Sequence, residues 1–277
     1  MLDPDRLRVA DFYEWLGCQT IAAAQLGCNQ STVSRRCREA RQLATGHSSV
    51  AQKDFLCLER AVHQRWRFAR ARELRLHGYR WIQPLLRGNL PESWRLNPAE
   101  VSVTPVCPLQ LLGDHVIDAL LAPWPVVAGL DRRRFALFPV YSTPMLLLAP
   151  AAGSLALQTG LGHAEIAGSS QLRRLPFVPP SAWDCTQQLD GQLFGTAATP
   201  SEETLVESRY WGMALTPLIR TDLVALPYEI PIGYGEFLVC LQDWSGHGQM
   251  ERLLSAIRWV MAFESRDRPR LEMLAVA

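Results

Sequence analysis

A short stretch of amide, hydroxyl and guanidinium side chains is the part of this sequence best suited to bind an anion or a base edge. Its polar members are Gln30, Ser31, Thr32, Ser34, Arg35, Arg36 and Arg38. Arginine presents a fork of N–H groups that matches phosphate and base edges. Gln can bond purine edges in the major groove of DNA, whereas Ser and Thr can bond phosphate. A merely solvated helix face would usually mix in Glu and Lys, so the pattern favours a DNA contact surface.

The flanking residues predict three helices that would position this stretch. Gly17 can end a first helix, which carries an apolar stripe of Leu7, Phe12, Trp15 and Leu16. Thr20 is a suitable N-cap for a second, short helix. Asn29 caps a third helix that runs from Gln30 to about Leu43. The N-terminus of that third helix would also favour a phosphate.

The spacing of three further residues is typical of a helix-turn-helix. Ala23 is small enough to let two helices cross closely, Gly27 can take the left-handed conformation of a tight turn, and Val33 fills the angle between the helices. This order, small, then Gly, then β-branched, is the helix-turn-helix pattern. The alternative is an ordinary helical hairpin with a polar face.

The distribution of charge separates a basic first part from an acidic second part. The 277 residues carry a net charge of +1, but residues 1–100 hold 16 Lys and Arg against 10 Asp and Glu. The remainder holds 12 against 17. A basic module joined to an acidic one fits a nucleic-acid-binding protein. Lys53 is the sole lysine, so a GC-rich genome explains the abundance of arginine equally well.

Other function classes find little support in the sequence. The seven cysteines stand singly, which predicts neither a disulfide framework nor a zinc site and favours a reducing cytoplasm. No histidine pair has metal-ligand spacing, and no phosphate-binding loop or nucleophile elbow occurs. Residues 135–164 are uncharged, but Pro139, Pro144 and Pro150 would interrupt a membrane helix, which favours a buried strand. We therefore expect neither a cofactor, nor a metal, nor a membrane span.

The stretch "CQTIAAAQLGCNQSTVSRRC" resembles the N-terminus of the LysR-type transcriptional regulators. Their usual pattern is matched in register by Thr20, Ala22, Ala23, Leu26, Gln30, Ser31, Val33, Ser34 and Arg35. The resemblance implies that Asn29, Gln30, Ser31, Ser34 and Arg35 face DNA, in agreement with the chemistry of their side chains. With Thr20, Thr32, Arg36 and Arg38 they form the predicted DNA-binding set.

The sequence then departs from the family pattern. The family's wing should follow at once, but "HSSVAQKDFLCLERAVHQR" intervenes, with Phe55, Leu58, Val62 and Trp66 at helical spacing. We interpret 67–70 and 74–78 as a degenerate or displaced wing. The short stretch 77–89 is the candidate for the linker helix that pairs two family members, and 89–100 is interpreted as a linker.

Short apolar runs alternate with amphipathic segments after residue 100, which predicts an α/β fold. "GDHVIDALLA", "VYSTPMLLLAPAAGSLA", "WGMALTPLI…LVALP" and the helix at 248–263 resemble the LysR effector domain in order and spacing. The resemblance implies two lobes like those of a periplasmic binding protein, with a ligand between them. Only about 20 residues separate the linker from Gly113, so the first strand and helix of lobe one are expected to be missing or very short.

Polar residues near the expected strand ends are the candidates for effector contacts, because open α/β sheets bind ligands there. They are Thr104, Cys107, Tyr141, Ser142, Thr143, Gly195, Thr196, Tyr228 and Tyr234. Each has an alternative interpretation as an ordinary turn residue.

The sequence thus predicts a bacterial, cytoplasmic, LysR-like DNA-binding regulator without enzymatic activity, acting as a homodimer or homotetramer. The fold would be an N-terminal, winged helix-turn-helix followed by a two-lobed, periplasmic-binding-protein-like α/β domain. The expected divisions are 1–76, a linker at 77–97, and 98–277, with lobe I at about 98–142 and 222–277 and lobe II at about 143–221. The alternatives are an effector-sensing or protein-interaction module that no longer binds DNA, and an α/β enzyme.

Overall fold

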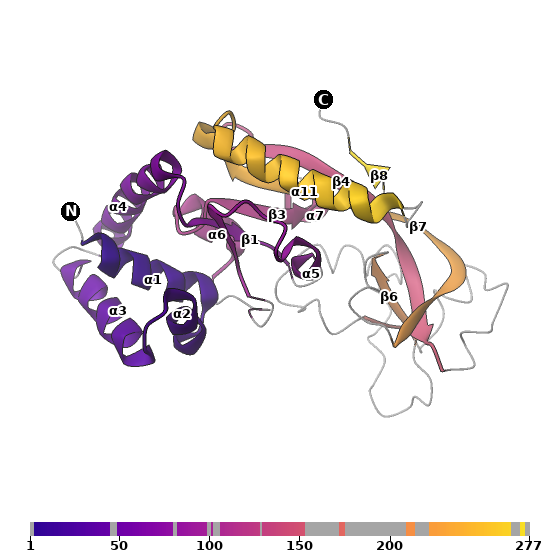
Figure 1. The fold of residues 1–277 in the computed structure, drawn as a ribbon, viewed down its shortest axis with the longest axis horizontal. Coiled ribbons are helices and arrows are strands. Elements are labelled where there is room, and N and C mark those ends of the chain that lie inside the picture. The colour runs from indigo at the N-terminus through magenta and orange to yellow at the C-terminus, as the bar shows by residue number, and fades with distance from the viewer. Residues whose placement is uncertain are drawn as a thin grey trace.

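Four helices form the N-terminal part of the protein. The computed structural model describes residues 3–44, 49–79, 82–98, 101, 106–127, 129–152, 172–174, 209–213, 222–266 and 272–274. The helices are α1 (Pro4–Leu16), α2 (Gln19–Leu26), α3 (Gln30–Ala44) and α4 (Ser49–Arg70). Figure 1 shows them gathered at one end of an elongated molecule. The apolar stripe predicted for the first helix is buried, with Leu7, Phe12, Trp15 and Leu16 at most 2% exposed.

The described strands form one mixed sheet after the helices, and two long strands run through it. Its strands are β1 (Leu74–His77), β2 (Trp94–Leu96), β3 (Ala119–Pro123), β4 (Phe135–Pro150), β5 (Leu172–Arg174), β6 (Arg209–Met213), β7 (Leu223–Leu241) and β8 (Glu272–Met273). The order is β2-β1-β3-β7-β4-β6-β5, with β8 beside β4. The strands β4 and β7 are antiparallel and cross from one part of the sheet to the other (Figure 1). This arrangement matches the crossover strands expected between two lobes.

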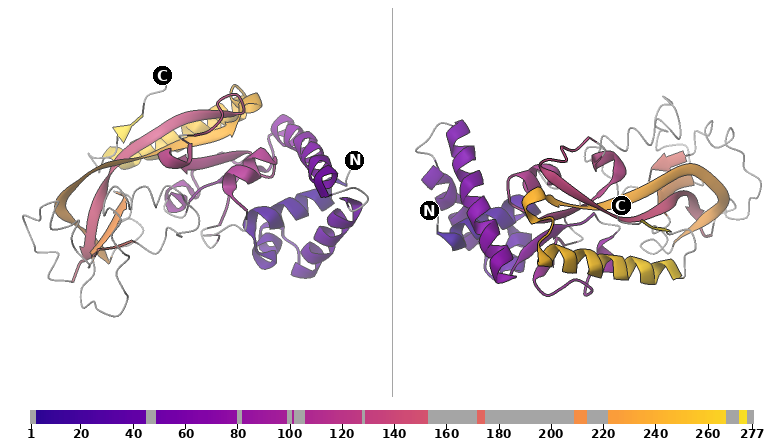
Figure 2. Two further views of the ribbon diagram at one scale, coloured as in Figure 1. Left: turned by 180° about the vertical axis from the view of Figure 1, so that it is seen from behind. Right: turned by 90° about the horizontal axis from the view of Figure 1, so that it is seen from above.

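Alternating side chains of the sheet enter two different cores. Leu238 and Cys240 of β7 join a core with Phe68 and with the buried face of helix α11 (Gly248–Arg266). Val239 and Leu241 face the opposite side, where a second core holds residues of α1, α2 and α3 together with α6 (Pro108–Gly113) and α7 (Trp124–Val127). The views of Figure 2 place α11 along one face of the sheet. Because successive side chains of a strand point to opposite faces, alternate residues of β7 pack into one core and the residues between them pack into the other.

The segments interpreted as a wing and a linker lie elsewhere in the fold. Residues 67–70 end α4, and 74–77 form β1, which pairs in parallel with both β2 and β3. The polar stretch interpreted as a linker contains β2, an edge strand of the sheet. The wing interpretation of these segments was therefore wrong. The segment 77–89 holds only the end of β1 and the single turn α5 (Gln83–Leu86), so the long helix before the sheet is α4.

The first strand and the first helix expected in lobe one can both be identified in the structure. The strand is present as β1, earlier in the chain than expected, whereas the helix after it is reduced to the four residues of α5. Both elements have only four residues, which agrees with the expectation that they are missing or very short, although the strand lies earlier in the chain than expected.

Two strands lie in the second half of the chain at segments of different length. The segment 209–213 is the short strand β6, whereas most of 101–106 lies outside the described residues. The uncharged run 135–164, which favours a buried strand, begins with the long strand β4. Pro139 and Pro144 lie at irregularities in its pairing with β7, as expected for proline, which lacks the N–H that a regular ladder needs.

Candidate nucleic-acid interface

Helix α3 begins at a side-chain cap supplied by Asn29. Its Oδ1 accepts the backbone N–H of Thr32 at 2.8 Å and the hydroxyls of Thr32 and Ser31 at 2.7 and 2.8 Å. The cap predicted from the sequence is therefore present, and it satisfies one of the donors that every helix start leaves unpaired. Since both hydroxyl protons are engaged here, a phosphate contact by Ser31 or Thr32 requires those hydroxyls to rotate.

The turn between α2 and α3 has the geometry that the residue spacing predicts. Gly27 adopts φ +65° and ends α2, and its N–H bonds back to the carbonyls of Ala23 and Ala24. Ala22, Ala23 and Val33 are buried, with Val33 at 0% exposure. A larger side chain at either alanine would have to push the two helices apart, and a β-carbon at Gly27 would strain the backbone.

The remaining predicted contact residues lie on the outer side of α3. Gln30, Ser31, Arg35 and Arg38 are exposed, whereas Thr32, Ser34 and Arg36 are half-buried. Arg36 forms an ion pair with Asp3 at 3.4 Å, while Arg35 and Arg38 form none with any residue that the structure describes. The guanidinium groups of Arg35 and Arg38 are therefore available to bind an external anion.

Thr20 does not cap α2. The N-cap is Cys18, which makes no side-chain capping bond, and Thr20 is an exposed residue within the first turn. The neighbouring Gln19 accepts a hydrogen bond from Gln30 Nε2 at 3.4 Å. The starts of α2 and α3 are thus adjacent, so Thr20 lies near the predicted contact surface although its expected capping role was wrong.

The helix-turn-helix is docked on the sheet through buried polar contacts that the sequence did not reveal. The indole N–H of Trp15 on α1 donates to His77 Nδ1 on β1 at 3.2 Å. Burial lowers the pKa of His77 to about 4, so the imidazole is neutral at pH 7 and its Nδ1 can accept. The guanidinium of Arg75, two residues earlier on the same face of β1, lies 4.8 Å from the ring centre of Phe12.

Asp11 on α1 connects two arginines from different elements. It accepts Arg60 Nε of α4 at 2.8 Å and Arg75 Nη1 of β1 at 3.3 Å. Arg60 also pairs with Glu14. Burial lowers the pKa of Arg75 to about 10, and nearby Arg67 contributes to this shift, so Arg75 still carries its charge at neutral pH. Charged groups that are buried this deeply persist only when they are paired.

Asp118 is the second centre of this network. Its carboxylate is 0% exposed and accepts Arg67 Nη2 and Nε at 2.8 and 3.0 Å, Gln64 Nε2 at 3.1 Å and the backbone N–H of Arg75 at 2.8 Å. It therefore joins α4 to β1 at the start of β3. The sequence signal that could have indicated it is a carboxylate immediately before a continuous apolar run.

The candidate effector contacts are only partly brought together. The paired strands β4 and β7 place Tyr141, Ser142 and Thr143 opposite Glu236, Gly235 and Tyr234. Tyr141, Thr143 and Glu236 are at most 1% exposed, and burial together with the Glu236 carboxylate raises the pKa of Tyr141 well above its usual value. Cys107 is exposed at the start of α6. Thr104, Gly195 and Thr196 lie outside the described residues, and so do the side chains of Tyr228 and Tyr234.

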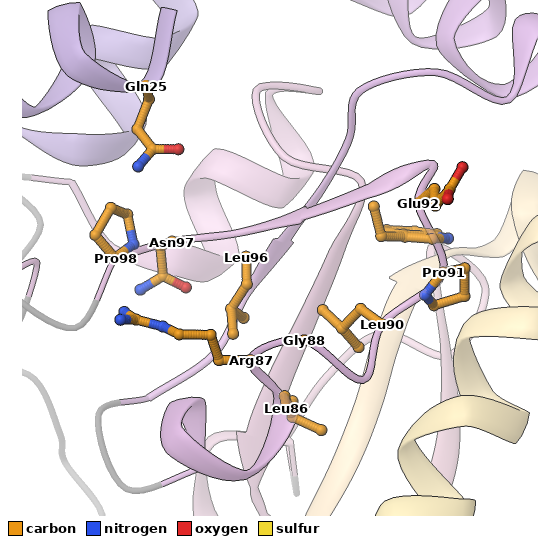
Figure 3. Close-up of a pocket in the computed structure, with 11 residues that line it drawn as sticks. Gln25, Leu86, Arg87, Gly88, Leu90, Pro91, Glu92, Leu96, Asn97 and Pro98 are labelled. Atoms are coloured by element: carbon orange, nitrogen blue, oxygen red, sulfur yellow. The ribbon is translucent and has the colours of Figure 1, made fainter.

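A cavity of about 480 Å³ lies between α2 and the edge of the sheet. Figure 3 shows Gln25 of α2 facing Asn97 and Pro98 across it. Its charged lining residues are Arg87 and Glu92, which balance each other. The lining therefore gives no preference for an anion or a cation.

The described part of the chain shows neither a metal-binding cluster nor a membrane-spanning helix. No group of three or more His, Cys, Asp or Glu side chains there is placed to hold a metal ion. No described helix is both long enough and apolar enough to cross a membrane.

Solved structures of LysR-family regulators share this fold. The regulatory domain of NMB2055 (MetR), a LysR family regulator from N. meningitidis, gives a TM-score of 0.51 at 15% identity, covering 74% of this chain and 100% of that chain. A point mutant of full-length OxyR from Pseudomonas aeruginosa gives 0.52 at 13% identity, covering 93% and 98%. A point mutant of OxyR from Corynebacterium glutamicum gives 0.50 at 12% identity, covering 94% and 93%.

The fold class expected from the sequence is thereby confirmed: an N-terminal helical region precedes an α/β domain like the two-lobed effector domain of full-length LysR regulators. By sequence alone, no family model and no curated protein matches the chain. At these identities the likeness concerns the fold, and residue roles have to be argued from this chain.

Proposed function

We propose that this chain is a LysR-like, sequence-specific DNA-binding regulator of transcription. The observation that carries the proposal is the pair of exposed guanidinium groups, Arg35 and Arg38, on the third helix of a helix-turn-helix. Arginines at that place can bond guanine edges or phosphates, while Gln30, Ser31 and Ser34 position the helix or contact bases. The shared fold with LysR-family regulators supports the same function.

Replacing Arg35 with alanine is expected to weaken DNA binding by about 1–3 kcal/mol, because one arginine contact to a base or phosphate is lost. The DNA fragments are first selected from genomic DNA with the purified protein, and affinity is then titrated by fluorescence anisotropy. Arg133→Ala, an exposed arginine in the turn before β4, is the matched control and should bind normally. Unchanged affinity of the Arg35 variant would refute its role, and a flat response of the wild type to salt would count against phosphate contacts.

The contact between protein and DNA is proposed to involve two copies of the chain, since one recognition helix covers only a half-site. We assign the pairing helix to α4, whose Leu58 and Val62 are 70% and 39% exposed and lie four residues apart on one face. Leu58→Glu should convert a dimer into a monomer in sedimentation experiments, whereas Gln110→Glu on α6 should not. A wild-type chain that sediments as a monomer at micromolar concentration contradicts this assignment.

The proposed regulator has two parts with a boundary near residue 72. The helical part ends with α4, and the α/β part begins at β1, because β1 belongs to the sheet. A small-molecule effector is proposed to bind between the lobes, beside the crossover residues Tyr141, Ser142, Thr143 and Tyr234.

A second candidate function is a sensing or interaction module without DNA binding. One observation favours it, namely that the segments interpreted as a wing form the end of α4 and strand β1 instead. The same anisotropy titration separates the two candidates, since this module would retain no salt-dependent affinity for any selected fragment.

A further inference from the structure

A cavity rich in arginine lies where α1, the end of α4 and β1 meet. Its volume is about 280 Å³, which suits a small metabolite. Five of its lining residues are arginines, namely Arg8, Arg67, Arg70, Arg72 and Arg75, against the two carboxylates of Asp5 and Glu73. The cavity lies outside the crossover region of β4 and β7, so it is separate from the proposed effector site.

The ion pairs around this cavity leave an excess of positive charge. Arg8 pairs with Glu73 through two bonds of 2.6 and 2.5 Å, and Glu73 is shared with Arg95. Arg67 and Arg75 are held by Asp118 and Asp11. Arg70 and Arg72 are exposed and form no ion pair with any described residue. Two cations at the cavity mouth are therefore available to an incoming anion.

Two lining side chains also keep a buried nitrogen without a hydrogen-bond partner. His63 and Arg75 are 6% and 1% exposed, and neither His63 Nε2 nor Arg75 Nε is bonded to any described residue. Arg75 Nε always carries a proton, and neutral His63 can carry one at Nε2. Because buried N–H groups normally have acceptors, these two side chains bring unmet hydrogen-bonding capacity to the wall of the cavity.

Trp66 gives one wall of the cavity a rigid, apolar character. Its ring stacks on His63 with 5.1 Å between ring centres, and the Arg70 guanidinium lies 5.9 Å from its centre. Stacking on Trp66 limits the rotamers of His63 before a ligand arrives, which lowers the entropic cost of binding.

We propose that this cavity binds a small organic oxyanion, a carboxylate or a phosphate ester, and that the bound anion tightens the docking of the helix-turn-helix on the sheet. The anion would contact the last turn of α4 through Arg70 and the segment before β1 through Arg72, beside the first turn of α1. It would thus bridge three elements that are otherwise held by the buried ion pairs. The site does not require that α3 binds DNA.

The test is calorimetric titration of the full chain at constant ionic strength with citrate, glycerol 3-phosphate and inorganic phosphate as separate probes. At least one probe should bind saturably with one site per chain and raise the melting temperature. Citrate and glycerol 3-phosphate distinguish a carboxylate from a phosphate ester. The double variant Arg70→Ala/Arg72→Ala should weaken the dissociation constant at least tenfold.

The matched control is Arg132→Ala/Arg133→Ala, which removes two exposed arginines from the turn before β4. It should change the dissociation constant less than twofold. Absence of saturable binding for all three probes overturns the proposal, and so does an equal loss in both double variants, which would indicate non-specific attraction. A variant at Arg70 and Arg72 that loses DNA affinity while no probe binds would place these residues in the DNA interface instead. A failure of DNA binding alone leaves the calorimetric result intact, so the two proposals fail separately.

Discussion

Asp118→Ala is expected to lower the free energy of unfolding by about 3–5 kcal/mol, because it leaves a buried cation without its partner. The carboxylate accepts four hydrogen bonds from α4 and β1, and no solvent reaches it. Its removal leaves the guanidinium of Arg67 without its carboxylate partner and the backbone N–H of Arg75 without an acceptor. Urea unfolding followed by circular dichroism measures the change.

The control for this prediction is Asp54→Ala, which removes an exposed carboxylate of α4 outside the network. It should change the free energy of unfolding by less than about 0.5 kcal/mol. Asp118→Asn separates the effect of the lost charge from the effect of the lost side-chain volume. Asparagine has nearly the same shape as aspartate, and its amide oxygen can still accept some of the hydrogen bonds. If Asp118→Ala unfolds like the wild type, the network does not hold α4 against the sheet.

Acidification from pH 7.5 to pH 5 is expected to lower the free energy of unfolding of the wild type by about 2 kcal/mol through the protonation of His77 alone. In the folded protein burial lowers the pKa of His77 to about 4, against an ordinary value of 6.5. Below pH 6.5 the unfolded chain therefore binds a proton that the folded protein excludes. The stability contributed by neutral His77 is complete above pH 6.5 and is lost as the pH falls toward 4, to a total of about 3 kcal/mol.

The comparison protein for this prediction is His77→Gln. A glutamine oxygen can accept the Trp15 N–H as His77 Nδ1 does at 3.2 Å, but glutamine does not titrate. Urea unfolding at several pH values should give a shallower pH dependence for the variant than for the wild type. Other buried histidines and carboxylates contribute equally to both proteins, so the difference between the curves isolates His77. Parallel curves would show that His77 gains a proton as easily in the folded state as in the unfolded one.

The two predictions concern one physical feature, which is the direct docking of the N-terminal helices on the sheet. Residues of α1, α2 and α3 share a core with α6, α7, β3 and β7, and Asp11 and Trp15 add polar contacts to Arg75 and His77. The N-terminal helices and the sheet are therefore in direct contact through packed side chains as well as through polar bonds.

The sequence by itself determined the local features of the candidate interface. Gly17 and Gly27 end their helices in the left-handed conformation, and Asn29 caps α3. These features depend on the backbone freedom of glycine and on a side chain that reaches its own helix, so neighbouring residues suffice to specify them. The spacing of Ala23, Gly27 and Val33 likewise predicted a helix crossing that involves residues close in the chain.

Only the tertiary structure decided the role of the segment from 67 to 77. Four residues that alternate between apolar and polar side chains can pair with any free strand. The stretch "LRLH" was therefore compatible with a strand of a wing as well as with a strand of the sheet. Its partners β2 and β3 lie roughly 20 and 40 residues further along the chain, and they turn Leu74 and Leu76 toward α11 and Arg75 and His77 toward α1. A buried arginine or carboxylate also cannot be recognised from residue type, because its burial depends on counter-charges such as Asp11 and Asp118, which distant elements supply.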